Sequence, residues 1–122
     1  MVDCYSIYLP HVNVNDGKSR VMGNLALYIK LLKRFDGRKM VNQLIDSILE
    51  GDVDKIIQQA HALRGAASNL SLPTLHSIVD RIEESASQGQ DPIGFADELE
   101  AATDALEKTF ENFFANTEVI DT

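Results

Sequence analysis

Apolar residues recur at helical spacing through most of this 122-residue chain. From about Val53 to Leu70, they follow one another at steps of four, three, four and three residues, at Ile56, Ala60, Leu63, Ala67 and Leu70. This spacing puts them on one face of a helix, which we expect to be buried. Only a short alternating run, at Tyr5, Ile7 and Leu9, has any strand character. The fold class that the sequence predicts is therefore all-α.

Turn and capping residues divide the rest of the chain into further helices. We expect a short helix capped near Asn15-Asp16-Gly17 and ending near Met22, followed by helices over about 24–35, 38–49, 53–70 and 73–89, and a last helix beginning at Asp91-Pro92. Short connections between long amphipathic helices make antiparallel neighbours. The last four helices are therefore expected to form an up-down four-helix bundle, and the first two to cover one end of it.

The length is sufficient for one domain with one core. We assign residues 1–13 to an N-terminal arm that packs on the body, 14–117 to the bundle domain and 118–122 to a frayed tail.

Composition excludes several classes of function. The net charge of −8 argues against a nucleic-acid partner, because phosphate binding needs a positive surface. A single cysteine, Cys4, rules out an internal disulfide and a cysteine-rich metal site. We see no leader pattern and no run of about 18 apolar residues, so we expect a cytoplasmic protein without a membrane contact.

One segment of the predicted 53–70 helix has the residues of a chemical site. His61 lies beside the apolar stripe, with Arg64 three residues later and Gly65 four residues later on the same face. A glycine inside a helix costs about 1 kcal/mol relative to alanine, so its presence needs a reason. Here the missing side chain leaves room for a bulky group to approach the imidazole, and Arg64 can bind an anion held there. The alternative for any lone histidine on a helix is a structural or solvated role.

The stretch His61-Ala62-Leu63-Arg64-Gly65 resembles the motif of the histidine-containing phosphotransfer (HPt) family, in which the cation is usually lysine. The resemblance extends to the helix that ends at Phe35 and to the turn at Glu50-Gly51-Asp52. It implies the same bundle, and a phosphoryl group carried on Nε2 of His61. The family has a glycine where this chain has Ser71, which puts the turn geometry there in doubt.

A hairpin argument adds a candidate partner for the histidine. If the turn after the 53–70 helix centres near Ser71, Glu83 lies level with His61 on the next helix. Its carboxylate can accept the Nδ1 proton and leave Nε2 free; a solvated helix residue is the alternative. For Arg64 the alternative is an ordinary surface cation. The expected surface for a partner is made of Ile57, Gln58, Arg64, Gly65 and Ser68.

Together these features predict a phosphocarrier in a multistep phosphorelay. It accepts a phosphoryl group from the aspartyl phosphate of a receiver domain and passes it to another response regulator. By the resemblance, its partners are receiver domains and a hybrid sensor histidine kinase, and the Mg²⁺ belongs to the receiver. We expect a monomer with no cofactor, no metal site and no autokinase activity, because no nucleotide-binding loop occurs. The main alternative is a helical interaction module with the fold but without the chemistry, and a helical metalloprotein is more distant.

Overall fold

The computed structural model describes residues 9–117, and this range is helical throughout its length apart from short connections. The elements are α1 (Val14–Arg20), α2 (Leu25–Arg34), α3 (Gly37–Glu50), α4 (Val53–Asn69), α5 (Pro73–Ser87), the 3₁₀ helix η2 (Pro92–Phe95) and α6 (Ala96–Thr117). No strand is present in residues 9–117. The all-α fold class is therefore confirmed.

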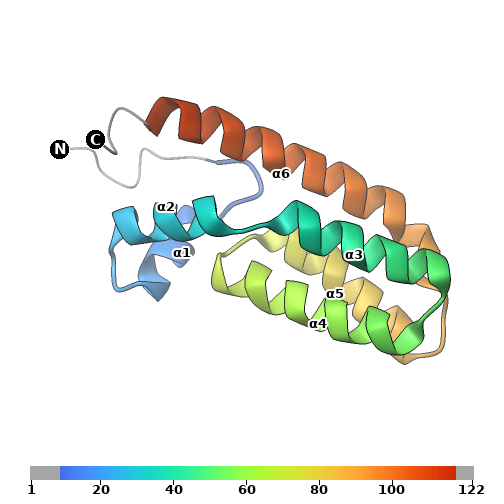
Figure 1. The fold of residues 1–122 in the computed structure, drawn as a ribbon. Coiled ribbons are helices and arrows are strands. Elements are labelled where there is room, and N and C mark those ends of the chain that lie inside the picture. Colours follow the sequence, from blue (N-terminus) through green and yellow to red (C-terminus); the bar gives the residue numbers. More distant parts are fainter. Residues whose placement is uncertain (1–8, 118–122) are drawn as a thin grey trace.

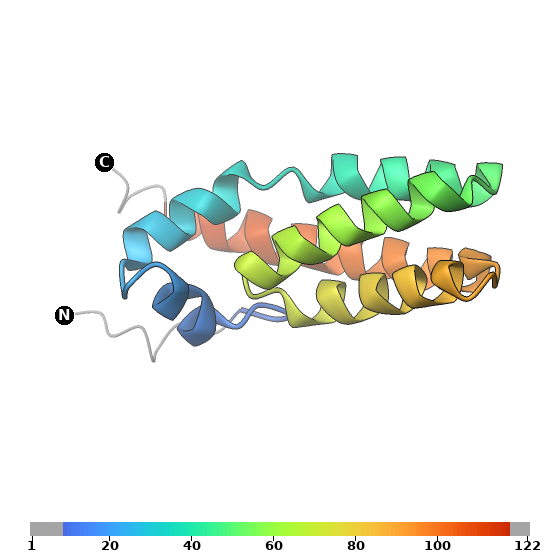
Figure 2. The same ribbon diagram turned by 90° about the horizontal axis from the view of Figure 1, so that it is seen from below.

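Four helices form the bundle that the short connections predicted (Figure 1). Helix α3 packs on α4 and α6, and α5 packs on the same two helices, so the four enclose one core. Figure 2 shows α4 and α5 side by side along their whole length, as expected for an antiparallel hairpin. Every residue of the predicted α4 stripe is buried: Ile56, Ala60, Leu63, Ala67 and Leu70.

Local capping explains where several of the helices begin and end. The Asn24 side chain accepts a hydrogen bond from the backbone of Leu27, and the Asp52 side chain accepts one from Lys55. Each of these caps pairs a backbone N–H that a helix start would otherwise leave unpaired. Gly51 ends α3 with a φ of 72°, a left-handed conformation that glycine adopts readily.

Helices α1 and α2 cover the end of the bundle where α4 turns into α5. The Tyr28 hydroxyl, on α2, donates a 2.6 Å hydrogen bond to the backbone oxygen of Leu70. Burial, with a smaller effect of the Asp16 charge, raises the pKa of Tyr28 to about 12. On α1, a Cβ added to Gly17 would lie 2.2 Å from the Tyr28 ring, so only glycine fits there. The two helices therefore pack closely at this end.

The turn between α4 and α5 uses a serine in a conformation that favours glycine. Ser71 has a φ of 58°. Its hydroxyl donates a 2.5 Å hydrogen bond to Asp16 on α1, and its backbone oxygen accepts one from Asn13. The turn therefore keeps the left-handed geometry without a glycine, and its side chain ties α1 to the bundle.

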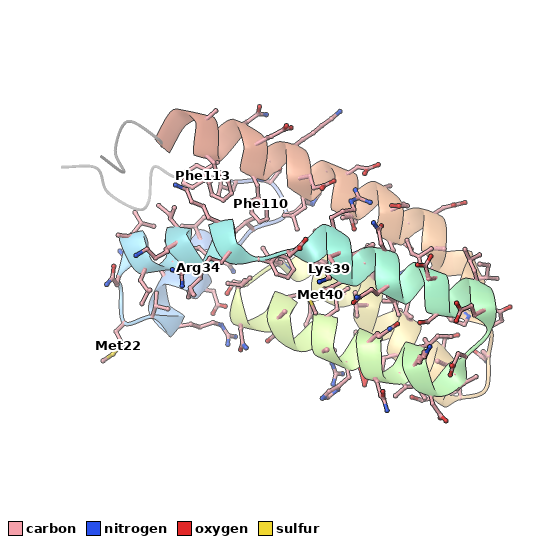
Figure 3. The ribbon with its side chains drawn as sticks, viewed as in Figure 1. Met22, Arg34, Lys39, Met40, Phe110 and Phe113 are labelled. Carbon is pink, nitrogen blue, oxygen red and sulfur yellow. The ribbon has the colours of Figure 1, made fainter. Side chains whose placement is uncertain are left out.

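The C-terminal part of α6 reaches beyond the bundle and packs against the junction of α2 and α3. Figure 3 shows Phe110 and Phe113 directed from α6 toward that junction. Both are half-buried, and Phe110 stacks on Phe114 with 5.5 Å between ring centroids. These rings extend the core over α2.

The structure corrects three details of the predicted boundaries. Helix α1 is capped by Asn13 instead of Asn15-Asp16-Gly17. Helix α1 ends at Arg20 because the chain turns at Met22, whose backbone adopts a left-handed φ of 58°. The Met22 side chain is 97% exposed and projects from the turn between α1 and α2 (Figure 3). The last helix is preceded by η2, whose proline lies in its first turn.

The arm expected at 1–13 is described only from residue 9. Leu9 and Val12 are buried against the body. The alternating residues Tyr5 and Ile7, and the tail expected at 118–122, lie outside the described residues.

Candidate functional site

His61 lies near the middle of α4, on the side opposite the core. Its neighbours in the apolar stripe, Ala60 and Leu63, are fully buried, which fixes the rotation of the helix about its axis. The His61 side chain is left 68% exposed. An imidazole in this position is open to solvent on a rigid helix.

Glu83 on α5 lies beside the imidazole ring. Its Oε1 lies 3.2 Å from His61 Nδ1, within hydrogen-bond distance. The Glu83 side chain is only 16% exposed. The contact agrees with the hairpin register expected from the sequence. His61 Nε2 makes no hydrogen bond within residues 9–117, so it faces solvent.

Arg64 fills the space between His61 and α5. Its Nη2 lies 3.2 Å from His61 Nδ1, and its Nη1 donates a 2.9 Å hydrogen bond to Asp80 Oδ1. Its Nε lies 3.3 Å from Glu83 Oε2 as an ion pair without hydrogen-bond alignment, and that oxygen is buried without a hydrogen-bond partner. In this structure the cation therefore contacts the histidine and two carboxylates, and is not directed into solvent.

Asp80 was missed by the sequence analysis, although a signal for it existed. It precedes Glu83 by three residues, so the two carboxylates share one face of α5. The hairpin register that placed Glu83 beside His61 also places Asp80 beside Arg64. Applying that register to every polar residue of α5 would have identified it.

At Gly65 the space that a side chain would enter is empty among residues 9–117. Gly65 is exposed, and a Cβ added to it would meet nothing within 4 Å. Packing within the described protein therefore gives no reason for a glycine here.

The other residues of the expected partner surface differ in exposure. Ile57 and Ser68 are half-buried, and Gln58 is exposed. Gln58 makes no side-chain hydrogen bond within the described range. Only Ile57 is a large apolar side chain among them, and the carboxylates of Glu83 and Asp80 lie beside this surface. The face around His61 is therefore small and polar.

The described part of the chain holds neither a metal-binding cluster nor a membrane-spanning helix. No group of three or more His, Cys, Asp or Glu side chains is placed to hold a metal ion. None of the helices in residues 9–117 has the length and apolarity that crossing a bilayer requires.

The fold and this face define a four-helix bundle that presents an exposed imidazole from the middle of a helix, within 3.2 Å of a carboxylate and of a guanidinium. The family model described as Hpt domain matches residues 35–109, more than half of the chain, and the protein belongs to that family. The matched range includes His61, Arg64, Gly65 and Glu83. Hpt domains are phosphocarrier modules of phosphorelays. Neither a curated protein nor a solved structure matches the chain.

Proposed function

We propose that this protein is a phosphorelay intermediate whose His61 accepts a phosphoryl group from the aspartyl phosphate of a receiver domain and passes it to a second receiver. The observation that carries the proposal is the setting of His61: its side chain is 68% exposed, its Nδ1 lies 3.2 Å from Glu83 Oε1, and a Cβ added to Gly65, one turn along the same face, would meet nothing within 4 Å. A neutral imidazole with Nδ1 protonated has its lone pair on Nε2, which makes that atom the nucleophile.

The atoms and charges of the transfer step balance, and no proton has to leave the imidazole ring. The Nε2 lone pair attacks phosphorus, the N–P bond forms, and the bond from phosphorus to the aspartate oxygen breaks. The aspartate departs as a carboxylate with the electron pair of that bond. The ring becomes a phospho-imidazolium whose Nδ1 proton stays directed at Glu83, and the Glu83 charge stabilises it.

The partners follow from the family and from the chemistry of the site. The donor and acceptor are receiver domains, and the relay begins with a hybrid sensor histidine kinase. We expect the Mg²⁺ of the reaction in the receiver, so this chain needs no cofactor and has no kinase activity of its own. Following the family, we propose a cytoplasmic location and a monomeric carrier.

The position of Gly65 favours this proposal over a helical interaction module without chemistry. Gly65 is exposed, and a Cβ added to it would meet nothing within 4 Å. Glycine at such a position lowers helix stability by about 1 kcal/mol relative to alanine. A closely approaching partner that must reach His61 accounts for that cost.

The test is transfer of labelled phosphoryl from a phosphorylated receiver domain of the same source. The wild-type protein should gain an acid-labile, base-stable label, as a P–N bond requires, and His61→Gln should gain none. His76→Gln is the matched control, because His76 lies on α5 outside this site, and it should be labelled like wild type. Label persisting in His61→Gln would refute the assignment, and receiver binding without any label would favour the interaction module.

A further inference from the structure

Two groups contact one nitrogen of His61, and their chemistry is incompatible. Nδ1 lies 3.2 Å from Glu83 Oε1 and 3.2 Å from Arg64 Nη2. A carboxylate oxygen can only accept a hydrogen bond, and a guanidinium can only donate one. A single ring nitrogen cannot serve both, because it carries either a proton or a lone pair.

Each pairing therefore corresponds to one tautomer of the neutral ring. When Nδ1 is protonated it donates to Glu83, Nε2 has the lone pair, and Arg64 Nη2 faces another donor. When Nδ1 is unprotonated it accepts from Arg64, Nε2 carries the proton, and Glu83 Oε1 faces a lone pair. Either arrangement leaves one partner unsatisfied. Only the first exposes a nucleophilic nitrogen to solvent.

We propose that Arg64 and Glu83 compete for His61 Nδ1 and so set the tautomer of the ring, and that Asp80 is the positioning residue that keeps Arg64 in the competition. Asp80 binds Arg64 Nη1 at 2.9 Å and holds the guanidinium beside the ring. Glu83 binds the same cation only loosely, since its buried Oε2 lies 3.3 Å from Nε without a hydrogen bond.

This competition gives Arg64 two successive roles, on the basis of the proposed phosphotransfer. In the free protein its hydrogen bond to Nδ1 keeps part of the population with a proton on Nε2. A phosphoryl group approaching Nε2 offers anionic oxygens, which bind a guanidinium more strongly than a neutral ring nitrogen does. Arg64 then leaves Nδ1 for the phosphoryl oxygens, and the Nδ1 proton is held by Glu83. The substrate itself thus selects the nucleophilic tautomer.

The tautomer can be measured directly, without a partner or a phosphoryl group. In ¹H–¹⁵N correlation spectra of the whole protein at alkaline pH, where imidazole rings are neutral, the two ring nitrogens report the ratio of the Nδ1–H to the Nε2–H form. Arg64→Met should raise that ratio and Glu83→Ala should lower it, each by about threefold or more, the effect of one charge-assisted hydrogen bond weakened by solvent exposure. Asp80→Asn should raise it by less.

Matched controls remove the same charges without touching the ring. Arg81→Met removes a cation paired with Glu98, and Glu84→Ala removes the carboxylate next to Glu83. Both should leave the His61 ratio at its wild-type value. The competition is overturned if Arg64→Met and Glu83→Ala shift the ratio in the same direction or leave it unchanged, and the role of Asp80 is overturned if Asp80→Asn alone has no effect. Because the protein is unphosphorylated throughout, a failure here is distinct from a failure of label transfer.

Discussion

Two glycines inside helices, Gly17 on α1 and Gly65 on α4, have opposite surroundings. Gly17 is buried, and an added Cβ would overlap the ring of Tyr28 at 2.2 Å. Gly65 is exposed, and an added Cβ would meet nothing within 4 Å. Each gives up about 1 kcal/mol of helix stability relative to alanine.

Under the proposed function, the difference separates a packing requirement at Gly17 from a functional one at Gly65. The reason for Gly17 lies within the molecule, since the close approach of α1 to Tyr28 fills the space that a side chain would occupy. For Gly65 the described residues offer no such reason, which agrees with the proposal that a partner needs the open surface. From the sequence we expected Gly17 in the turn that caps the first helix, so the contrast between the two glycines came only with the structure.

Among the tests of this comparison, the largest effect we expect is slower transfer in Gly65→Gln. A glutamine beside His61 would displace the incoming phosphoryl group by more than an ångström, and such a misplacement costs on the order of a hundredfold in rate. The unfolding free energy should stay equal or rise, because glutamine is a better helix former. Single-turnover label transfer and urea denaturation measure the two quantities.

The control for this substitution is Ala62→Gln, which adds the same side chain to an exposed position one residue from the histidine and about 100° around the helix. It should transfer at close to the wild-type rate. If Gly65→Gln transferred at the wild-type rate, the proposal that Gly65 keeps the site open for a partner would be refuted, and so would the contrast with Gly17.

Alanine at the two glycines should change stability in opposite directions. Gly17→Ala should lower the unfolding free energy by about 2 kcal/mol, because the Tyr28 ring must move out of a packed position. Gly65→Ala should raise it by up to about 1 kcal/mol. Denaturation of both variants under one set of conditions checks the signs, and two changes of the same sign would contradict the comparison.

A smaller effect concerns the pH dependence of the tie between α1 and the bundle. The hydrogen bond from Ser71, and then that from Arg20, lowers the pKa of Asp16 below its ordinary value of 3.8. Because the folded-state pKa is the lower one, the stabilisation is fully present above about pH 4 and is lost as pH falls through the folded pKa. Amide chemical shifts of α1 and Ser71 should therefore change over this acidic range, and Asp16→Asn should abolish that change.

Most of the helical framework could be predicted because it depends on local chemistry. Periodic apolar residues, the caps at Asn24 and Asp52, and the stop at Gly51 all act within a few residues. The contact between Glu83 and His61 was also accessible, because a tight hairpin of two straight helices fixes which residues lie level.

The features that the sequence left open or placed wrongly are ones that apolar periodicity does not determine. Ser71 keeps a left-handed φ while bound to Asp16, which is 55 residues away in the chain. Met22 adopts a left-handed φ in the turn between α1 and α2, and α1 therefore ends at Arg20, before the expected end near Met22. The three contacts of Arg64 depend on the conformation of a long side chain between two helices, which periodicity does not determine.

Arg38, in the first turn of α3, holds three carboxylates of α6. Its guanidinium contacts Glu100 at 2.7 Å, Glu107 at 2.5 Å, and Asp104 between them. If α6 slid along its axis by one residue and turned with its own helical repeat, that acidic face would rotate by about 100° and lose all three contacts. One arginine thus reinforces the axial position that the buried residues of α6 set, and with it how far the aromatic end of that helix extends over α2.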